Sequence, residues 1–171
     1  AGVVEEMKDG KSVPTKTPKD YECELWTHFE ATRTVARPFA YLIPAGRTDI
    51  TDVLQRHGIE VEELREDIEL DLEAYTIDTM SKSPQPFQGH AVATVGATAS
   101  AVTRRTAAGT VVVRTGQRLG TLAAYLLEPA CEDGLTTWNF FDSDLRMGGE
   151  FPVLRLPKPT PITTGRVRAL S

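Results

Sequence analysis

The chain has 171 residues, of which 40% are hydrophobic and 25% are charged, so it has the size and apolar content of one ordinary globular domain. Its 24 acidic residues outnumber its 19 basic ones, and a net charge of −5 makes nucleic acid a poor candidate partner. No apolar run approaches the ~20 residues of a membrane-spanning helix, and no charged start followed by an apolar stretch marks a signal peptide, so no membrane partner is expected.

The first twenty residues predict an extended lead-in. Asp9-Gly10 is a strong signal for a tight turn between two short strands, which indicates a possible hairpin. Pro14 and Pro18 then interrupt the pattern and favour an exposed connector. The alternation of residues in 21–29 predicts a strand.

The next segments alternate between strands and one clear helix. An apolar run at 39–43, closed by Pro44, predicts a buried strand. Apolar residues at helical spacing predict a helix from Thr48 or Asp49 to His57, and Gly58 suits the left-handed position that ends it. Two further strands follow, whose residues are Ile59, Val61 and Leu64, and then Ile68, Leu70, Leu72 and Ala74, joined by a turn at 65–67. In the second strand these apolar residues alternate with acidic ones, so one face of the strand should be exposed to solvent.

The remaining elements are a loop at 81–88, an Ala, Thr and Val-rich stretch at 91–102, and a strand at 110–114. A helical stripe from Leu119 to Leu127 is ended by Pro129, although Gly120 inside it leaves its start uncertain. This order predicts an α+β fold, with a mixed β-sheet and about two helices in a single domain. The strand–helix–strand unit at 39–64 is a candidate parallel crossover. The expected organisation is a lead-in at 1–20, an accessory α+β domain at 21–157 and a Pro-rich tail at 158–171.

Histidine chemistry gives the first candidate site. His57 and Glu60 have the His-x-x-Glu spacing of a zinc ligand pair, and His90 is available as a third ligand. The alternative interpretation is that His57 interacts with the C-terminal dipole of its own helix, and Gly58 then directs Glu60 elsewhere. The second interpretation is favoured, so we expect no metal or cofactor in this chain.

Other reactive patterns are weak. The chain has no Gly-x-Ser-x-Gly elbow and no glycine-rich phosphate loop. Cys23 and Cys131 are compatible either with one long-loop disulfide or with two thiols. No residue is therefore assigned a catalytic role.

Aromatic residues are concentrated near the C-terminal end. Inside the fold, these side chains would supply core area; on the surface, beside acidic acceptors, they would form a platform for a peptide or a sugar. Core is the preferred interpretation, and the candidate binding surface is Trp138, Phe140, Phe141, Asp142 and Asp144.

Several strings resemble the region that follows the catalytic domain in large bacterial zinc carboxypeptidases. They are Thr32-Arg33-Thr34-Val35 with Arg37-Pro38 and Ala40 to Pro44, His57-Gly58-Ile59 with Val61-Glu62 and Leu64, Pro86 to His90, Leu126 to Pro129, and Asp133-Gly134-Leu135 with Trp138 to Asp142. The resemblance covers roughly 18–156. It implies a non-catalytic C-terminal accessory domain, whose parent binds zinc in a separate peptidase domain.

The resemblance also implies partners and a location. The peptidase domain of the same polypeptide would be the main partner, and a peptide or cell-wall ligand a further one. The parent would be secreted or periplasmic. Two alternatives remain open: an independent peptide- or carbohydrate-binding module, and a small metalloenzyme that uses His57, Glu60 and His90.

Overall fold

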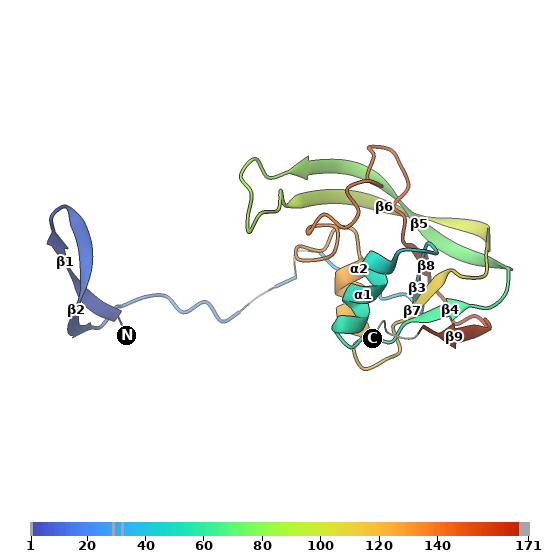
Figure 1. Ribbon diagram of the computed structural model, residues 1–171, viewed down its shortest axis with the longest axis horizontal. Coiled ribbons are helices and arrows are strands. Elements are labelled where there is room, and N and C mark those ends of the chain that lie inside the picture. The colour runs from blue at the N-terminus through green and yellow to red at the C-terminus, as the bar shows by residue number, and fades with distance from the viewer. Residues whose placement is uncertain (1, 29, 32, 168–171) are drawn as a thin grey trace. The chain divides into compact units, whose positions relative to one another are not determined.

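The computed structural model describes residues 2–28, 30–31 and 33–167. The chain divides into two compact units, Ala1–Val35 and Ala36–Ser171. Each unit is described by itself below, and Figure 1 labels their elements.

The first unit contains a two-stranded antiparallel hairpin. β1 (Gly2–Lys8) pairs with β2 (Lys11–Lys19), and Lys8 lies opposite Lys11. Asp9 and Gly10 both have positive φ, 51° and 74°, which is the backbone of a type I′ turn. The Asp-Gly signal therefore identified this hairpin correctly.

The strand predicted at 21–29 is wrong, because residues 21–28 have no strand partner and are exposed; Phe29 lies outside the described residues. An alternating sequence becomes a strand only where a neighbouring backbone accepts its hydrogen bonds, and none pairs with this segment. Leu25 and Trp26 are 83% and 78% exposed. This part of the first unit is an extended connector.

The second unit is built on one seven-stranded sheet with the order β6-β5-β8-β3-β7-β4-β9. Its strands are β3 (Ala40–Ile43), β4 (Glu62–Leu64), β5 (Ile68–Lys82), β6 (Ala93–Thr106), β7 (Val111–Arg114), β8 (Leu154–Leu156) and β9 (Thr164–Arg166). Every strand pair described in this sheet is antiparallel. The predicted mixed sheet is therefore wrong, and the fold is predominantly β with two helices.

The parallel crossover predicted at 39–64 exists in direction, but its two strands are not neighbours in the sheet. β3 and β4 each pair antiparallel with β7, so they run parallel to one another. They are not neighbours, however, because β7 lies between them. The strand–helix–strand unit exists, but its two strands bond to β7 rather than to each other.

Both helices contribute to one hydrophobic core. α1 (Thr48–Arg56) buries Ile50 and Leu54, and α2 (Gly120–Leu127) buries Ala123 and Leu127. These side chains pack with residues from one face of the sheet, among them Tyr41, Ile43, Val111 and Val113. Gly58 has φ of 80° and its N–H donates to the Gln55 carbonyl, which confirms the predicted end of α1.

The opposite face of the sheet packs against itself. A second core cluster joins β3, β4, β5, β7 and β8 through Ala40, Leu42, Leu64, Leu70, Leu72, Val112 and Leu156. Because no helix contributes to this cluster, the sheet must curl so that its own strands cover it. The short link between β4 and β5, which are far apart in the sheet order, forms one corner of this curl.

β5 is longer than the sequence pattern predicted. From Ile68 to Leu72 the even-numbered residues are the more buried ones and the odd-numbered residues are exposed, as expected for a strand that is wet on one side. From Tyr75 the odd-numbered face is buried instead, since Tyr75 and Ile77 join the helix-side core. The buried face of β5 therefore switches from the even-numbered to the odd-numbered residues partway along the strand. One regular alternation of apolar and polar residues does not predict such a switch.

The segment predicted as a tail carries the last strand of the sheet. β9 pairs with β4, and the N–H of Arg65 donates to the Thr163 carbonyl. Val167 is bonded to Val61 and to Gln55 through its backbone. Residues 168–171 lie outside the described part of the chain. Neither helix described is long and apolar enough to cross a membrane.

Candidate functional site

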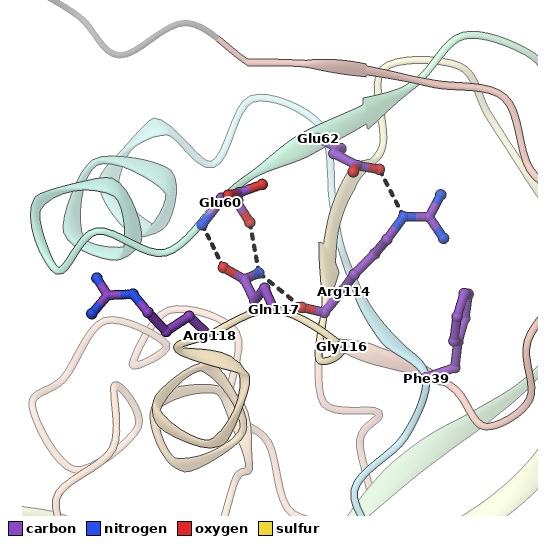
Figure 2. Close-up of a pocket in the computed structure, with 7 residues that line it drawn as sticks. All are labelled: Phe39, Glu60, Glu62, Arg114, Gly116, Gln117 and Arg118. Carbon is purple, nitrogen blue, oxygen red and sulfur yellow. Dashed lines mark hydrogen bonds and ion pairs between the residues drawn. The ribbon is translucent and has the colours of Figure 1, made fainter.

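A pocket of about 460 Å³ opens where the end of β7 meets the approach to β4 (Figure 2). The lining residues come from three segments that the sheet brings together: the residue before β3, the start of β4, and the loop from β7 to α2. They are Phe39, Glu60, Glu62, Arg114, Gly116, Gln117 and Arg118. Two carboxylates and two guanidinium groups therefore line the pocket.

Arg114 is the best-held cation of the pocket. Its Nε donates to Glu62 Oε2 at 2.9 Å, and its guanidinium carbon lies 5.3 Å from the centre of the Phe39 ring. Thr164 of β9 donates to the same Glu62 oxygen at 2.6 Å. Stacking on an aromatic ring and pairing with a carboxylate fix the orientation of this arginine.

Gln117 holds the pocket wall together. Its side-chain oxygen accepts from the Glu60 N–H at 2.7 Å, and its Nε2 donates to the carbonyls of Glu60 and Arg114 at 3.0 and 2.8 Å. Both ends of this amide are occupied, so Gln117 positions the loop. Arg118 is exposed, and Glu60 Oε2 is 3.3 Å from Arg166 at the surface. These two groups are accessible to a polar ligand.

A separate network of polar groups is buried beneath α2. Glu128, 6% exposed, accepts hydrogen bonds of 2.7 Å from the hydroxyls of Tyr41 and Tyr75. Arg155, also 6% exposed, brings its Nε to 3.2 Å from Glu128 Oε1 and donates from Nη1 to Glu73 at 2.8 Å. A buried charge is costly unless it is paired and hydrogen-bonded. Glu128 meets this requirement, whereas the Nε of Arg155 faces Glu128 as an ion pair without a hydrogen bond.

The network changes the acidity of both tyrosines. Burial, and then the hydrogen bond to the Glu128 carboxylate, raise the pKa of Tyr41 far above its ordinary value of 10.0. The same causes in the same order raise the pKa of Tyr75. Both hydroxyls therefore stay protonated and donate to Glu128. The arrangement ties β3, β5, β8 and the end of α2 together, and is well suited to holding the fold.

An aromatic patch lies at the tip of the β5–β6 hairpin. Phe87, 58% exposed, is 6.4 Å from the Trp138 ring, and His90 meets Trp138 edge-on at 5.3 Å between centroids. A tight turn at Gln88 and Gly89, both with positive φ, brings Phe87 and His90 side by side. Sequence reasoning named Trp138 but not Phe87, although the string Pro86 to His90 was part of the resemblance.

The predicted binding surface is divided by the structure. Phe141 is fully buried and packs edge-on against Phe151, and Phe140 is half-buried beside the same core. Trp138 is half-buried in the aromatic patch, where its Nε1 donates to Asp133. The two acidic residues are used in ion pairs: Asp142 with Lys82 at 2.5 Å, and Asp144 with Arg47 at 2.9 Å.

The structure does not bring His57, Glu60 and His90 together. The Nδ1 of His57 is 2.8 Å from the carbonyl of Val53, in its own helix, and the carboxylate of Glu60 meets Arg166. The Nδ1 of His90 is 3.2 Å from Asn139 Oδ1. Within residues 2–28, 30–31 and 33–167, no group of three or more His, Cys, Asp or Glu side chains could hold a metal ion. Cys23 is exposed in the first unit, and Cys131 is half-buried in the second.

Known proteins resemble most of the chain. It is 28% identical over 130 residues to "Carboxypeptidase 2" of Trichophyton equinum, and 27% identical over the same length to the proteins of that name from Trichophyton tonsurans and Trichophyton rubrum. The match covers 76% of this chain but only 24% of each relative. No family model and no solved structure matches. The 130 residues are a carboxypeptidase-related region, and these relatives are fungal rather than bacterial.

Proposed function

We propose that this chain is a non-catalytic accessory domain of a zinc carboxypeptidase, and that it packs on the peptidase domain of the same polypeptide. The observation that supports this proposal best is the 130-residue similarity to three carboxypeptidases, which extends over only a quarter of their length. Most of such a protein lies outside the matching region, which leaves room for a separate peptidase domain.

The side chains of the second unit favour a structural role over a catalytic one. The buried carboxylate and guanidinium of Glu128 and Arg155 are engaged with each other and with two tyrosines, away from the 460 Å³ pocket. In the pocket itself, Glu62 and Arg114 neutralise each other. Perturbed pKa values often mark catalytic acids and bases in accessible positions, and here the strongly raised pKa values belong to buried tyrosines.

A direct assay tests this proposal. The 171-residue chain, supplied with Zn²⁺, is expected to release no amino acid from peptides with a free C-terminus. Turnover that a chelator abolishes, and that His57→Ala also removes, would revive the small metalloenzyme and contradict the accessory role.

The positive counterpart uses a relative. Deleting the matching region from Carboxypeptidase 2 of Trichophyton rubrum should lower the thermal midpoint of the remaining protein, because packed surface becomes exposed, while the peptidase fraction that stays folded keeps its kcat. An unchanged midpoint would contradict packing between the two parts.

A second candidate function, an independent peptide- or carbohydrate-binding module, is favoured by the aromatic patch alone. Phe87, 58% exposed, and Trp138 present ring surface at a hairpin tip, and His90 packs edge-on against Trp138. Stacking of a sugar ring or an apolar side chain on such a surface is a common mode of binding.

Fluorescence distinguishes this candidate from the first. The chain has two tryptophans, and Trp26 in the connector is 78% exposed, so a Trp26→Phe background leaves Trp138 as the single reporter. Titration with chitin or peptidoglycan fragments, or with peptides, should shift or quench the Trp138 signal if the module binds them. Phe87→Ala should then weaken binding, whereas Met147→Ala, at an exposed apolar residue outside the patch, should not.

A further inference from the structure

A groove of about 360 Å³ lies beside the start of β6. Residues 92–95 form one wall, and residues 129–132 with Thr137, from the segment that follows α2, form the other. This volume falls within the roughly 300–1,000 Å³ of pockets that hold small ligands. The groove is therefore large enough to accept a long side chain of another polypeptide.

The groove adjoins the aromatic patch of Phe87, His90 and Trp138. Thr137 lines the groove and the next residue, Trp138, belongs to the patch, while Val92 lines the groove two residues after His90. A hydrogen bond from the Ala93 N–H to the Thr137 carbonyl holds these two stretches of chain together. A ligand seated in the groove would therefore also contact the rings of the patch.

The walls of the groove are mostly apolar and carry a single charge. Glu132 is the one charged residue among those that line it, and this side chain is exposed. Within the described part of the chain, no hydrogen bond or ion pair engages the Glu132 carboxylate. Lysine and arginine combine an apolar stem with a cationic head, which is the combination that such a groove complements.

The polar groups that the patch leaves available are acceptors. Asp133 accepts from the Trp138 Nε1 through Oδ1, which leaves its second oxygen for a ligand. Asn139 donates from Nδ2 to the Ala91 carbonyl, so its Oδ1 accepts from the Nδ1 of His90. In a neutral imidazole with its proton on Nδ1, the exposed Nε2 is an acceptor. The patch therefore suits a ligand that donates hydrogen bonds.

The charge of this surface favours a cation over a neutral ligand. Neither Glu132 nor Asp133 has an ion-pair partner among the residues that the structure describes. Lys82, at the end of β5, is already paired with Asp142 at 2.5 Å. Two unpaired carboxylates attract a basic group, repel an acidic one and give a neutral sugar no electrostatic advantage.

We propose that the groove and the aromatic patch form one binding site for a basic side chain, lysine or arginine, of an extended peptide. The aliphatic stem lies between the apolar walls, the cationic head meets Glu132, and the neighbouring part of the peptide packs on Trp138 and Phe87. The proposal rests on the second candidate function, the binding module, and assigns it a basic peptide rather than a neutral sugar. No contact with the C-terminus of the peptide is involved.

Fluorescence of Trp138 in the Trp26→Phe background tests the ligand. The probes are acetylated and amidated pentapeptides, Ala-Ala-Lys-Ala-Ala and its counterparts with norleucine or glutamate at the centre. The lysine peptide should bind up to about fivefold more tightly than the norleucine peptide, which is the contribution of one exposed ion pair. This advantage should shrink at high salt, because exposed charges are screened. The glutamate peptide should bind most weakly.

Variants of the chain test the residues. Glu132→Lys should reverse the preference, so that the glutamate peptide binds better than the lysine peptide. The matched control is Glu69→Lys, at an exposed carboxylate of β5 that lies at the opposite end of the β5–β6 hairpin, and it should leave the preference unchanged. Phe87→Ala should weaken the lysine and norleucine peptides alike, because it removes ring surface and no charge.

The results separate this site from the functions proposed above. A norleucine peptide that binds as tightly as the lysine peptide, or a preference that survives Glu132→Lys, would overturn the proposal. Binding of chitin fragments without binding of the peptides would overturn it too, while the binding module would stand. If no probe binds at millimolar concentration, the site and the module both fail, and the accessory role is unaffected.

Discussion

At Gly120 the loop after β7 turns into α2, and the glycine is fully buried there. A Cβ atom built on this residue would overlap the carbonyl oxygen of Thr115, which is backbone and cannot move aside as a flexible side chain would. The sequence pattern alone suggested that this glycine weakens the helix. The structure shows instead that it allows the helix to begin close against the end of β7.

Gly120→Ala should therefore destabilise the protein by about 1–3 kcal/mol, the usual cost of overpacking, although alanine stabilises most helices relative to glycine. Urea denaturation followed by circular dichroism measures the change. Gly116→Ala is the matched control, because a Cβ there would meet nothing within 4 Å. Equal stability of the two variants would contradict the close approach at Gly120.

Glu128 is the residue on which the buried network depends. Glu128→Gln removes one of the two carboxylates that face the buried Arg155 and the charged acceptor of both tyrosine hydroxyls, while Arg155 keeps its bond to Glu73, so the free energy of unfolding should fall by about 1–3 kcal/mol. Glu150→Gln removes the carboxylate that pairs with Arg104 at the surface and should change the free energy of unfolding by less than about 1 kcal/mol. If both variants lost the same stability, Glu128 would not have the role described.

The two tyrosines of this network predict a loss of stability at high pH. Their folded-state pKa values lie above 10.0, so the unfolded chain releases these protons first as the pH rises. The stabilising contribution is complete below pH 10 and falls above it, by up to about 1.4 kcal/mol per pH unit for each tyrosine. Urea denaturation from pH 9 to 11.5 measures this slope. It should become shallower in Tyr41→Phe and in Tyr75→Phe.

Among the elements, those with a local signal were predicted well from the sequence. The Asp9-Gly10 turn, the Gly58 end of α1 and the apolar run of β3 each follow from backbone geometry or burial of neighbouring residues. The failures needed non-local information. Residues 21–28 alternate but have no partner, and β9 forms because β4 offers it an open edge.

The candidate site was less predictable than the fold. Glu128, Arg155 and the two tyrosines lie on four separate elements, and Tyr41 is 87 positions from Glu128 in sequence. Nothing in their local spacing marks them as a group. The pocket could not be predicted from local spacing either, since Glu62 and Arg114 meet only because β4 pairs with β7. By contrast, Trp138 was found from composition, because aromatics cluster around it in the sequence.

α2 and the β1–β2 hairpin should differ strongly in their importance for stability. Leu126 is 8% exposed and lies in the helix-side core. Leu126→Ala should lower the free energy of unfolding by about 2–5 kcal/mol. Removing residues 1–17 should lower the unfolding midpoint only slightly, because none of Val3, Met7 and Val13 is buried and an isolated hairpin is marginal in water. If the deletion prevented folding while Leu126→Ala changed stability only slightly, the hairpin rather than α2 would be essential for stability.

At the scale of the whole molecule, the chain consists of a small N-terminal unit and a larger sheet unit with its own cores. The connector in the first unit has exposed apolar residues and, among the residues described between 20 and 35, no strand or helix. Cleavage by a protease needs an extended, accessible segment of this kind. The strands and helices of the sheet unit, by contrast, must unfold locally before their backbone can be cut.

Chymotrypsin should therefore cut first after Tyr21, Leu25 or Trp26, and the fragment that contains the sheet unit should persist. Mass spectrometry identifies the cut, and the fragment should unfold at the same temperature as the second unit of the intact chain. Substituting Tyr21, Leu25 and Trp26 together by serine should slow this first cleavage, whereas Tyr125→Ser, at an exposed residue within α2, should not. A first cut within α2, after Tyr125, or a fragment that no longer folds, would contradict the independent stability of the sheet unit.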